Sequence, residues 1–238
     1  MKLFYDFHIH SGLSPCGDNE MTPNNIVNMA KLYDLDVIAL TDHNSTLNCE
    51  AVMEAGKEIG LTVIPGMELC TSEEVHIVCL FPDIKGATKF GDYIRSTLPT
   101  IRNKPTVFGD QLVFDKNDNV LGFEHTLLIT ASSISANDAV SIVADYGGIC
   151  FPAHIDRNSY SILSNLGTIN ESFRFNCAEV FDLDTLENLK SQHPHLNKLK
   201  ILSSSDAHYL EHLRLKENFI ETEENSIAAI FEYLKSPL

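Results

Sequence analysis

Short apolar runs alternate with amphipathic stretches along most of the chain. Seven runs have the length and composition of strands, and most are followed by a turn and a helical pattern. The runs cover residues 2–10, 36–41, 61–65, 74–81, 149–152, 177–181 and 200–204. Strand–turn–helix alternation of this kind predicts an α/β fold with about seven mostly parallel strands, arranged as a TIM-like βα-barrel.

Local signals mark the ends of several predicted helices. Thr22 and Pro23 predict an N-cap and a first helical residue, and an apolar stripe with helical spacing follows them. A helix over 47–59 is expected to stop at Gly60. Ser135 predicts the cap of a further helix that ends at the glycine pair 147–148, and residues 226–235 form an amphipathic C-terminal helix.

Residues 82–134 interrupt this rhythm. A helical piece at 88–98 leads to two apolar runs, 111–114 and 120–123, which flank a turn at 115–119 and predict a hairpin. We expect one domain over residues 1–238, since barrels of this length are common as single units. The segment 82–134 is predicted to be an insertion that partly covers the barrel mouth.

Composition narrows the function classes. Hydrophobic residues make up 44% of the chain, no run is long enough to span a membrane, and the start has no signal-peptide pattern. Six cysteines without a CxxC motif indicate a reduced, cytoplasmic protein. The net charge of −16 argues against an extended footprint on long duplex nucleic acid, which needs a basic stripe. It leaves a phosphorylated metabolite, a nucleotide or a short oligonucleotide as substrate, and we expect no membrane partner.

Side chains able to bind metal stand at or near the ends of several predicted strands. Parallel strands direct their C-terminal ends to one mouth, so ligands scattered in the sequence would form one cluster. The candidates are His8, His10, Asp18, His43, Glu68, His76, His154, Asp206 and His208. Such a cluster predicts a multinuclear metal site and hence a hydrolase.

The spacing of these residues supports metal binding as a set, although each motif alone is weak. His8 and His10 lie two apart on a strand and face the same side, and Asp206 and His208 have the same spacing. A histidine inside an apolar strand, such as His76, is more often a satisfied core residue. Imidazole and carboxylate without thiolate suit zinc, manganese or iron, and Glu68 can bridge two ions.

Six segments together resemble the polymerase and histidinol phosphatase (PHP) family of metal-dependent phosphoesterases. The resemblance covers nearly the whole chain apart from 82–134, and the segments follow the family's order. They are DFHIHSGLSPCGD, IALTDHN, VIPGMEL, EVHIVCLF, ICFPAHIDR and SSSDAH. The resemblance implies a distorted (βα)7 TIM-like barrel of PHP type that holds three divalent metal ions, zinc, manganese or iron.

The resemblance also implies how the ligands are shared among the ions. The first ion would take His8, His10, Glu68 and Asp206, and the second would take Glu68, His76 and His154. The third would take Asp18, His43 and His208. Many members have a shorter Ser-Asp-Gly loop, whereas Asp18 here follows SPCG, so its assignment is the weakest of the nine. The positive charge of three divalent ions would exceed the negative charge of their carboxylate ligands. The mouth would then be locally cationic and would suit an anionic substrate.

Four residues outside the nine have competing interpretations. Arg157 is either a two-pronged phosphate clamp or a solvated loop residue. Asp42 is expected to have a structural role. Glu179 could contact the site without binding metal itself. Cys16 is either an oxidation-sensitive thiol or, as we favour, a residue that packs in a turn.

We therefore predict a phosphoesterase in which a metal-activated hydroxide attacks phosphorus in a phosphate monoester, a nucleotide or a short oligonucleotide. Arg157, Asp206 and His208 are the residues expected to take part in catalysis. One alternative is an amidohydrolase on a related metal barrel, although Glu68 would replace the carboxylated lysine bridge typical of that class. A second alternative is a non-catalytic regulatory module, which a complete ligand set argues against.

Overall fold

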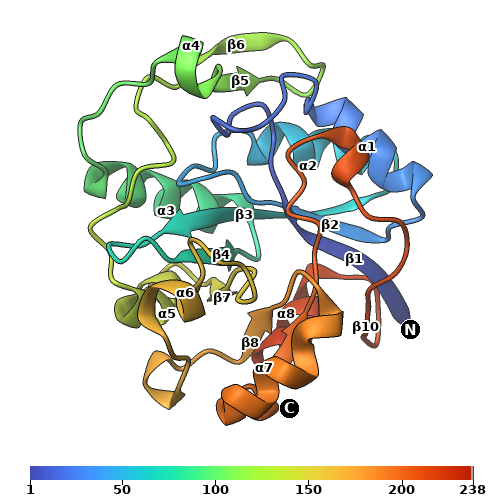
Figure 1. The fold of residues 1–238 in the computed structure, drawn as a ribbon. Coiled ribbons are helices and arrows are strands. Elements are labelled where there is room, and N and C mark those ends of the chain that lie inside the picture. The colour runs from blue at the N-terminus through green and yellow to red at the C-terminus, as the bar shows by residue number, and fades with distance from the viewer. Residues whose placement is uncertain (237) are drawn as a thin grey trace.

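A curled sheet with helices packed against it forms the body of the protein (Figure 1). The computed structural model describes residues 1–236 and 238. A six-stranded sheet has the order β10-β1-β2-β3-β4-β7, and β8 pairs with β9 in a separate parallel pair. The strands are β1 (Lys2–Ile9), β2 (Val37–Leu40), β3 (Thr62–Cys70), β4 (His76–Leu80), β5 (Leu112–Phe114), β6 (Val120–Phe123), β7 (Ile149–Pro152), β8 (Cys177–Glu179), β9 (Lys200–Leu202) and β10 (Phe219–Glu221).

The predicted helix starts at Thr22 and Ser135 are confirmed, because polar caps satisfy the free N–H groups of the first turn. Thr22 accepts a hydrogen bond from the Asn25 N–H, and Ser135 accepts one from the Asp138 N–H. The helices expected over 47–59 and 88–98 begin instead at Cys49 and Ile84. The helices are α1 (Pro23–Leu32), α2 (Cys49–Glu58), α3 (Ile84–Thr97), α4 (Pro105–Phe108), α5 (Ala136–Asp145), α6 (Ile162–Leu166), α7 (Leu186–Gln192) and α8 (Ile227–Lys235). Short 3-10 turns occupy Glu171–Phe173, Leu183–Thr185, Pro194–Lys198 and Leu210–His212.

The expectation of a mostly parallel sheet holds only in part. Strands β1, β2 and β3 are parallel, but β4 is antiparallel to both β3 and β7. Only residues 71–75 separate β3 from β4, and a parallel return needs a crossover of roughly a dozen residues or more. The β10 strand, which pairs antiparallel with β1, was not predicted.

A complete (βα)7 barrel is not formed by the strand ladders of residues 1–236. Only a single bridge, between Ile9 and Ala207, links β1 to the segment that follows β9. The arrangement is a curled half-barrel sheet with β8 and β9 beside it. The C-terminal ends of β1, β2, β3, β7 and β9 nevertheless lead into the same region, which is where the candidate ligands lie.

Apolar side chains of β1 and the C-terminal helix share one core. Leu3, Tyr5 and Phe7 pack in a cluster that also contains Ile230 and Phe231 of α8. The predicted amphipathic helix at 226–235 is thus confirmed, and its apolar face is buried against the sheet. No helix within residues 1–236 is long and apolar enough to cross a membrane.

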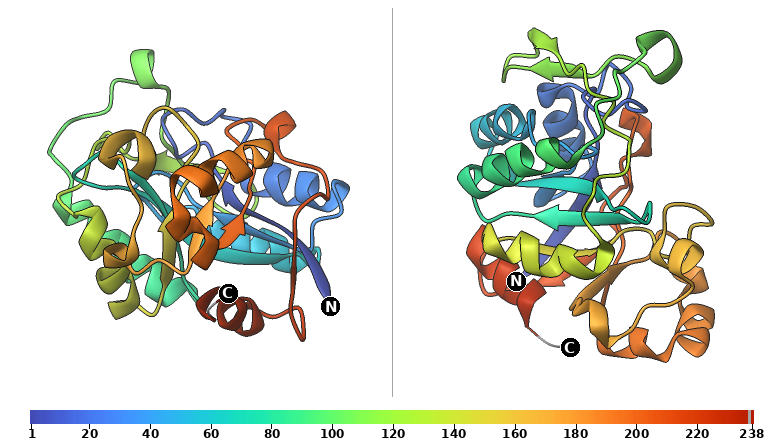
Figure 2. Two further views of the ribbon diagram at one scale, coloured as in Figure 1. Left: turned by 60° about the horizontal axis from the view of Figure 1, so that its bottom comes forward. Right: turned by 90° about the vertical axis from the view of Figure 1, so that its left-hand side faces the viewer.

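The interrupting segment 82–134 contains α3, α4 and the β5–β6 hairpin, which lies at one end of the molecule (Figure 2). Its hairpin was predicted at the right residues. The Leu112 N–H donates to the Gly12 carbonyl at 2.8 Å, and the Asn48 amide donates to the Leu112 carbonyl at 3.0 Å. The hairpin is therefore tied to the loop after β1 and to the start of α2, and its role as a lid stays a prediction.

Candidate metal centre

The strand pairing explains why distant histidines meet. His8 lies in β1 and His10 follows its end, while His43 follows β2 and forms a parallel bridge with Glu68 of β3. His76 is the first residue of β4 and pairs with Cys70. Because β4 runs antiparallel to β3, the first residue of β4 lies at the mouth. In a parallel strand, the last residue would lie there instead. The antiparallel direction of β4, which departs from the mostly parallel sheet that the sequence predicted, thus brings His76 to the site.

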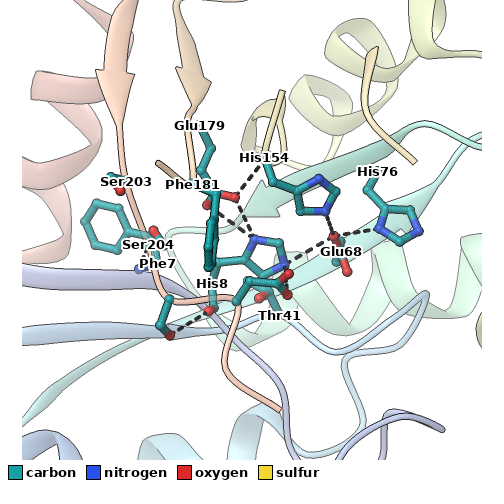
Figure 3. Close-up of polar contacts among 12 residues, drawn as sticks. Phe7, His8, Thr41, Glu68, His76, His154, Glu179, Phe181, Ser203 and Ser204 are labelled. Atoms are coloured by element: carbon teal, nitrogen blue, oxygen red, sulfur yellow. Dashed lines mark hydrogen bonds and ion pairs between the residues drawn. The ribbon is translucent and has the colours of Figure 1, made fainter. Parts of the chain in front are cut away.

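The buried Glu68 carboxylate is at the centre of the cluster (Figure 3). Five ring nitrogens surround its two oxygens, and four of them lie within 3.2 Å and belong to different strands or strand ends. The nitrogen–oxygen distances are 3.2 Å for His8 Nε2, 3.3 Å for His10 Nε2, 2.9 Å for His43 Nδ1, 2.8 Å for His76 Nδ1 and 3.2 Å for His154 Nε2. A carboxylate in this position can bridge metal ions.

Asp206 forms the second acidic point of the cluster. Its Oδ1 lies 3.4 Å from His8 Nε2 and 3.3 Å from His10 Nε2. The His208 ring stacks on that of His10 with centroids 4.1 Å apart. Asp206 has a φ of 52°, and His154 has a φ of 27°. Left-handed backbone is costly for residues with a side chain, and it is tolerated mainly where a site requires it.

Three groups of donor atoms lie close enough together to hold cations. The atoms within each group lie within 4.8 Å of one another. The groups are His8–His10–Glu68–Asp206, His43–Glu68–His76 and His10–His43–His208. The first group has the same members as the predicted first metal site, and His154 joins the second through its 3.2 Å contact with Glu68.

Asp18 belongs to none of these groups in the part of the chain that the structure describes. Its Oδ1 accepts a hydrogen bond from the Glu20 N–H at 2.8 Å, and its own N–H donates to the His208 carbonyl at 2.8 Å. The carboxylate thus closes a local turn. The other eight predicted ligands are gathered at the mouth.

Several polar atoms of the cluster face one another closely without forming hydrogen bonds, an arrangement that fits bound cations. His8 Nε2, His10 Nε2, His43 Nδ1 and Glu68 Oε2 are buried without a hydrogen-bond partner. Burying such atoms is costly unless something compensates for the lost water. Nitrogen and oxygen donors at this density are the ligands that zinc, manganese and iron prefer.

The ionisation of the metal-free cluster follows from burial and mutual charge. Burial would raise the pKa of Glu68, but the histidines around it, His76 first, hold it well below its usual range. Burial would lower the pKa of His8, but Glu179, Glu68 and Asp206 raise it well above its ordinary value. For His76 burial prevails and lowers the pKa to about 4. A neutral His76 beside an ionised Glu68 is ready to act as a ligand.

The PHP domain family model matches residues 6–133, more than half of the chain. The chain belongs to the PHP domain family. The matched part contains His8, His10, His43, Glu68 and His76, whereas the three remaining donors of the cluster come from residues beyond it.

Three similar proteins put the PHP assignment in context. A 5'-3' exoribonuclease of Haemophilus influenzae is 32% identical over 115 residues, which are 47% of this chain and 40% of that protein. A Bifidobacterium adolescentis protein, provisionally assigned as a metal-dependent phosphoesterase, has a similar structure with a TM-score of 0.64 and 18% identity, covering 97% of this chain and 95% of that one. Endonuclease Q, solved with a 27-mer duplex substrate, has a TM-score of 0.71 and 17% identity, covering 99% of this chain and 57% of that one.

These relatives are hydrolases, and they confirm the predicted enzyme class for this PHP chain. The chain spans less than half the length of the curated relatives it matches. The prediction that confined partners to small substrates and excluded long duplex nucleic acid is wrong, because a protein of the same fold was solved with a 27-mer duplex and a relative is an exoribonuclease. The net charge misled because it sums the whole surface, whereas binding depends on the local field at the mouth.

Residues behind the ligands hold the histidines in place. Glu179 Oε1 lies 3.0 Å from His8 Nδ1 and accepts the His154 N–H at 3.0 Å. The hypothesis that Glu179 supports the site is thus borne out by its contacts. Asp42 accepts hydrogen bonds from Ser11 and Ser14, and Ser14 Oγ lies 2.8 Å from His10 Nδ1. Carboxylates that orient ligand histidines in this way strengthen metal binding.

A cavity of about 240 Å³ opens over the cluster. Arg157 lies at its edge, with Nη1 3.0 Å from Asp206 Oδ2 and a side chain that is 41% exposed. Ile129 of the 82–134 segment also borders this cavity.

Sequence reasoning did not single out Tyr160, Ser14 or the position of Cys16. Tyr160 stacks on His76 with ring centroids 4.7 Å apart and lines the cavity. Cys16 also lines it, beside His43 and His208. Removal from water would raise the pKa of the Cys16 thiol, but the charge of His43 and hydrogen bonds with His208 and His43 lower it to about 5. Only the fold brings these residues to the site, since none stands at a strand end.

Proposed function

We propose that this PHP chain is a metal-dependent phosphodiesterase that cleaves nucleic acid. The observation that carries the proposal is the buried Glu68 carboxylate ringed by five imidazoles at the floor of an open cavity. Three divalent ions, zinc, manganese or iron, would be held by eight residues. These are His8, His10, His43, Glu68, His76, His154, Asp206 and His208.

Divalent ions bound there would act as Lewis acids on a phosphoryl oxygen and lower the pKa of a water. The residues of the chain determine where these effects apply. Glu179 orients the His8 ring through Nδ1 and leaves Nε2 directed at Glu68 and Asp206. Ser14, hydrogen bonded to Asp42, does the same for His10. The donor atoms are therefore oriented before any ligand arrives, which reduces the cost of binding.

Arg157 is suited to bind a phosphate oxygen at the edge of the site. Its guanidinium pairs with Asp206 and lies over the Phe181 ring, 4.3 Å from the centroid. Stacking on the Phe181 ring fixes the plane of the guanidinium. Its remaining N–H groups can donate to two oxygens of a phosphate. When Asp206 shares its charge with a cation, the guanidinium is freer to pair with substrate.

The names of the relatives support a phosphodiester of nucleic acid as the bond that is cleaved. Both the exoribonuclease relative and the endonuclease Q neighbour act on such bonds, although they differ in the kind of nucleic acid and in the site of cleavage. The net charge of −16 requires that binding depends strongly on the cations at the mouth, since the remaining surface repels a polyanion.

The test is a panel of 5'-phosphorylated RNA, single-stranded DNA and duplex DNA, each with Mn²⁺, Zn²⁺ or EDTA. We expect metal-dependent cleavage of at least one polymer, and no cleavage with EDTA. Glu68→Gln, purified in parallel, controls for contaminating nucleases. Hydrolysis of p-nitrophenyl phosphate with no cleavage of bis-p-nitrophenyl phosphate or any polymer would instead identify a phosphomonoesterase.

A further inference from the structure

A second cavity continues from the one over the metal centre. It has a volume of about 590 Å³ and shares two lining residues, Cys16 and Ile129, with the cavity of about 240 Å³ that contains the ligand histidines. We call this second cavity the side groove, and it is lined by residues 15–19, 107–109, 129 and 209. Because the two cavities share walls, a substrate held at the metal ligands can extend into the side groove.

The charge of the side groove does not suit a phosphate. None of the described residues that line it is a lysine or an arginine, and Asp18 contributes a carboxylate. The chain as a whole carries a net charge of −16, so a polyanion gains little from the surface outside the metal centre. A nucleic acid must therefore gain further binding free energy from contacts that do not involve its phosphates. Nucleobases offer such contacts, because every base can stack on an aromatic ring.

Tyr209 places an aromatic ring where the side groove meets the metal centre. It directly follows the candidate ligand His208, so the two Cα atoms are about 3.8 Å apart. Tyr209 is 42% exposed, and its ring packs against that of His212 in a T-shaped contact with centroids 5.0 Å apart. The Asp18 N–H donates to the His208 carbonyl at 2.8 Å, which ties this segment to the loop after β1. The ring is thus accessible and already restrained, which lowers the entropic cost of stacking a base on it.

The 82–134 segment supplies another wall of the side groove. Val107 of α4 is 67% exposed, and Phe108 beside it is half-buried. Gly109 has a φ of 79°, and a Cβ there would lie 2.8 Å from the Pro15 carbonyl oxygen. Glycine therefore allows the end of α4 to approach the loop after β1 closely. Exposed apolar and aromatic side chains that gather beside a candidate active site indicate a binding surface.

Tyr160 is a second exposed aromatic residue at the mouth, and it lines the cavity over the metal centre. Its ring already stacks on His76 with centroids 4.7 Å apart, and its carbonyl accepts the His76 N–H at 2.8 Å. The contacts of Tyr160 therefore serve a metal ligand. Tyr209 makes no such contact with a ligand ring among the described residues, so its ring is the one available to a base.

We propose that the side groove binds the nucleobase next to the cleaved phosphodiester and that this base stacks on Tyr209. This role of the groove rests on the proposed function, because it concerns the substrate of the same metal centre. The cations bind the phosphate and the side groove binds the base, so recognition does not require a basic surface. The base must be free of its own stack, as in a single strand, at a strand end or when turned out of a duplex. Tyr209 thus favours nucleotides over other phosphodiesters.

The decisive measurement is kcat/KM of the metal-loaded chain for the p-nitrophenyl esters of thymidine 3'-phosphate and thymidine 5'-phosphate. Each ester is compared with its abasic counterpart, in which hydrogen replaces the base. We expect the wild type to cleave at least one thymidine ester about tenfold faster than its counterpart, which is within the range that stacking on one aromatic ring contributes. Tyr209→Phe should keep this preference, because it keeps the ring, and Tyr209→Ala should lose it. Phe219→Ala is the matched control and should keep the preference, because Phe219 is 43% exposed on β10 and lines neither cavity.

Fluorescence provides a second measurement that does not depend on turnover. The probe is the 5'-monophosphate of 2-aminopurine deoxyriboside, whose emission falls when its base stacks on an aromatic ring. We expect quenching when the probe binds to the Zn²⁺-loaded wild type or to Tyr209→Phe. Tyr209→Ala should bind the probe about tenfold more weakly and quench it little.

The outcomes separate the side groove from the proposed function. Equal, metal-dependent cleavage of the thymidine and abasic esters by the wild type would overturn the role of the groove alone, as would a preference that survives Tyr209→Ala. A preference lost in Tyr160→Ala but kept in Tyr209→Ala would place the base over the metal centre instead. Because the preference is a ratio within one variant, partial unfolding of Tyr209→Ala does not alter it. Failure of the wild type to cleave any phosphodiester, with or without a base, would overturn the proposed function itself.

Discussion

The centre joins two halves that are held in place by different means. His8, Glu68 and His76 lie within strands. Glu68 and His76 are paired in the β3–β4 ladder, and His8 lies in β1 where its register with β2 shifts. His154, Asp206 and His208 lie in loops, and two of these residues have left-handed backbone. Strand-borne ligands are oriented by the hydrogen bonds of the sheet, whereas loop-borne ligands depend on side-chain contacts and on backbone strain that the rest of the fold must support.

Glu179 connects the two halves. The same carboxylate oxygen contacts His8 Nδ1 of the strand half and the His154 N–H of the loop half, both at 3.0 Å. In such a site the strand half can be rigid and the loop half adjustable, while both halves stay in contact with the same Glu179 carboxylate. The difference suggests that the strand half defines where the cations lie and the loop half adapts to the substrate.

Glu68→Gln should have the largest effect, because the strand half loses its bridging charge. Residues behind metal ligands typically contribute about 10–100-fold in affinity or activity, so losing the central ligand should cost more than about a hundredfold in kcat/KM. Metal content per chain should fall in parallel, as measured by mass spectrometry of the metals. Turnover within a few-fold of the wild type would remove Glu68 from the centre of the mechanism.

Glu179→Gln should weaken both halves together. The variant keeps the shape but loses the charge that orients His8, so metal affinity should fall by about 10–100-fold. Metal titration measures this directly, and circular dichroism should show an intact fold. Glu187→Gln is a suitable control, because its side chain is exposed on α7. If the metal affinity of Glu179→Gln matched that of this control, the Glu179 contacts would contribute nothing to metal binding.

Arg157→Lys should affect the loop half alone. Lys keeps the charge but not the planar fork, so kcat/KM on a phosphodiester substrate should fall about tenfold, roughly 1.4 kcal/mol of transition-state stabilisation. The comparison is made at equal metal loading, which should itself be unchanged. An unaltered kcat/KM would make Arg157 a solvated partner of Asp206.

Metal binding should slow hydrogen exchange more in the loops than in the strands. We expect about fivefold slower exchange, near 1 kcal/mol, for amides of 153–158 and 203–208 when metal is added, and little change in β1 and β3. Hydrogen–deuterium exchange with mass spectrometry resolves these segments. Equal protection in both halves would contradict the distinction between a rigid and an adjustable side.

Much of the fold and most of the site could be predicted from local sequence. Apolar runs located all strands from β1 to β9, including the β5–β6 hairpin, since burial favours these residues wherever the strand lies in the sheet. Eight candidate ligands were identified because histidine or carboxylate at strand ends is unusual unless it has a role.

Other features depended on tertiary structure. The reversed direction of β4 follows from the five-residue connection 71–75, and the barrel stays open because, among the described strands, no ladder joins β7 to β8 or β9 to β1. The carboxylate of Asp18 accepts the Glu20 N–H within its own loop and joins none of the donor groups of the described residues, which the local sequence did not predict.

The amino-acid sequence by itself therefore determined the elements and the donor atoms, because propensity, capping and burial act over a few residues. Tertiary structure alone decided which donors share a cation and which groups orient them. Glu179 lies 171 residues from His8 along the chain, and Asp42 reaches Ser14 across 28. Contacts over such separations depend on the packing of the whole sheet, so they cannot be predicted from the local pattern of residues.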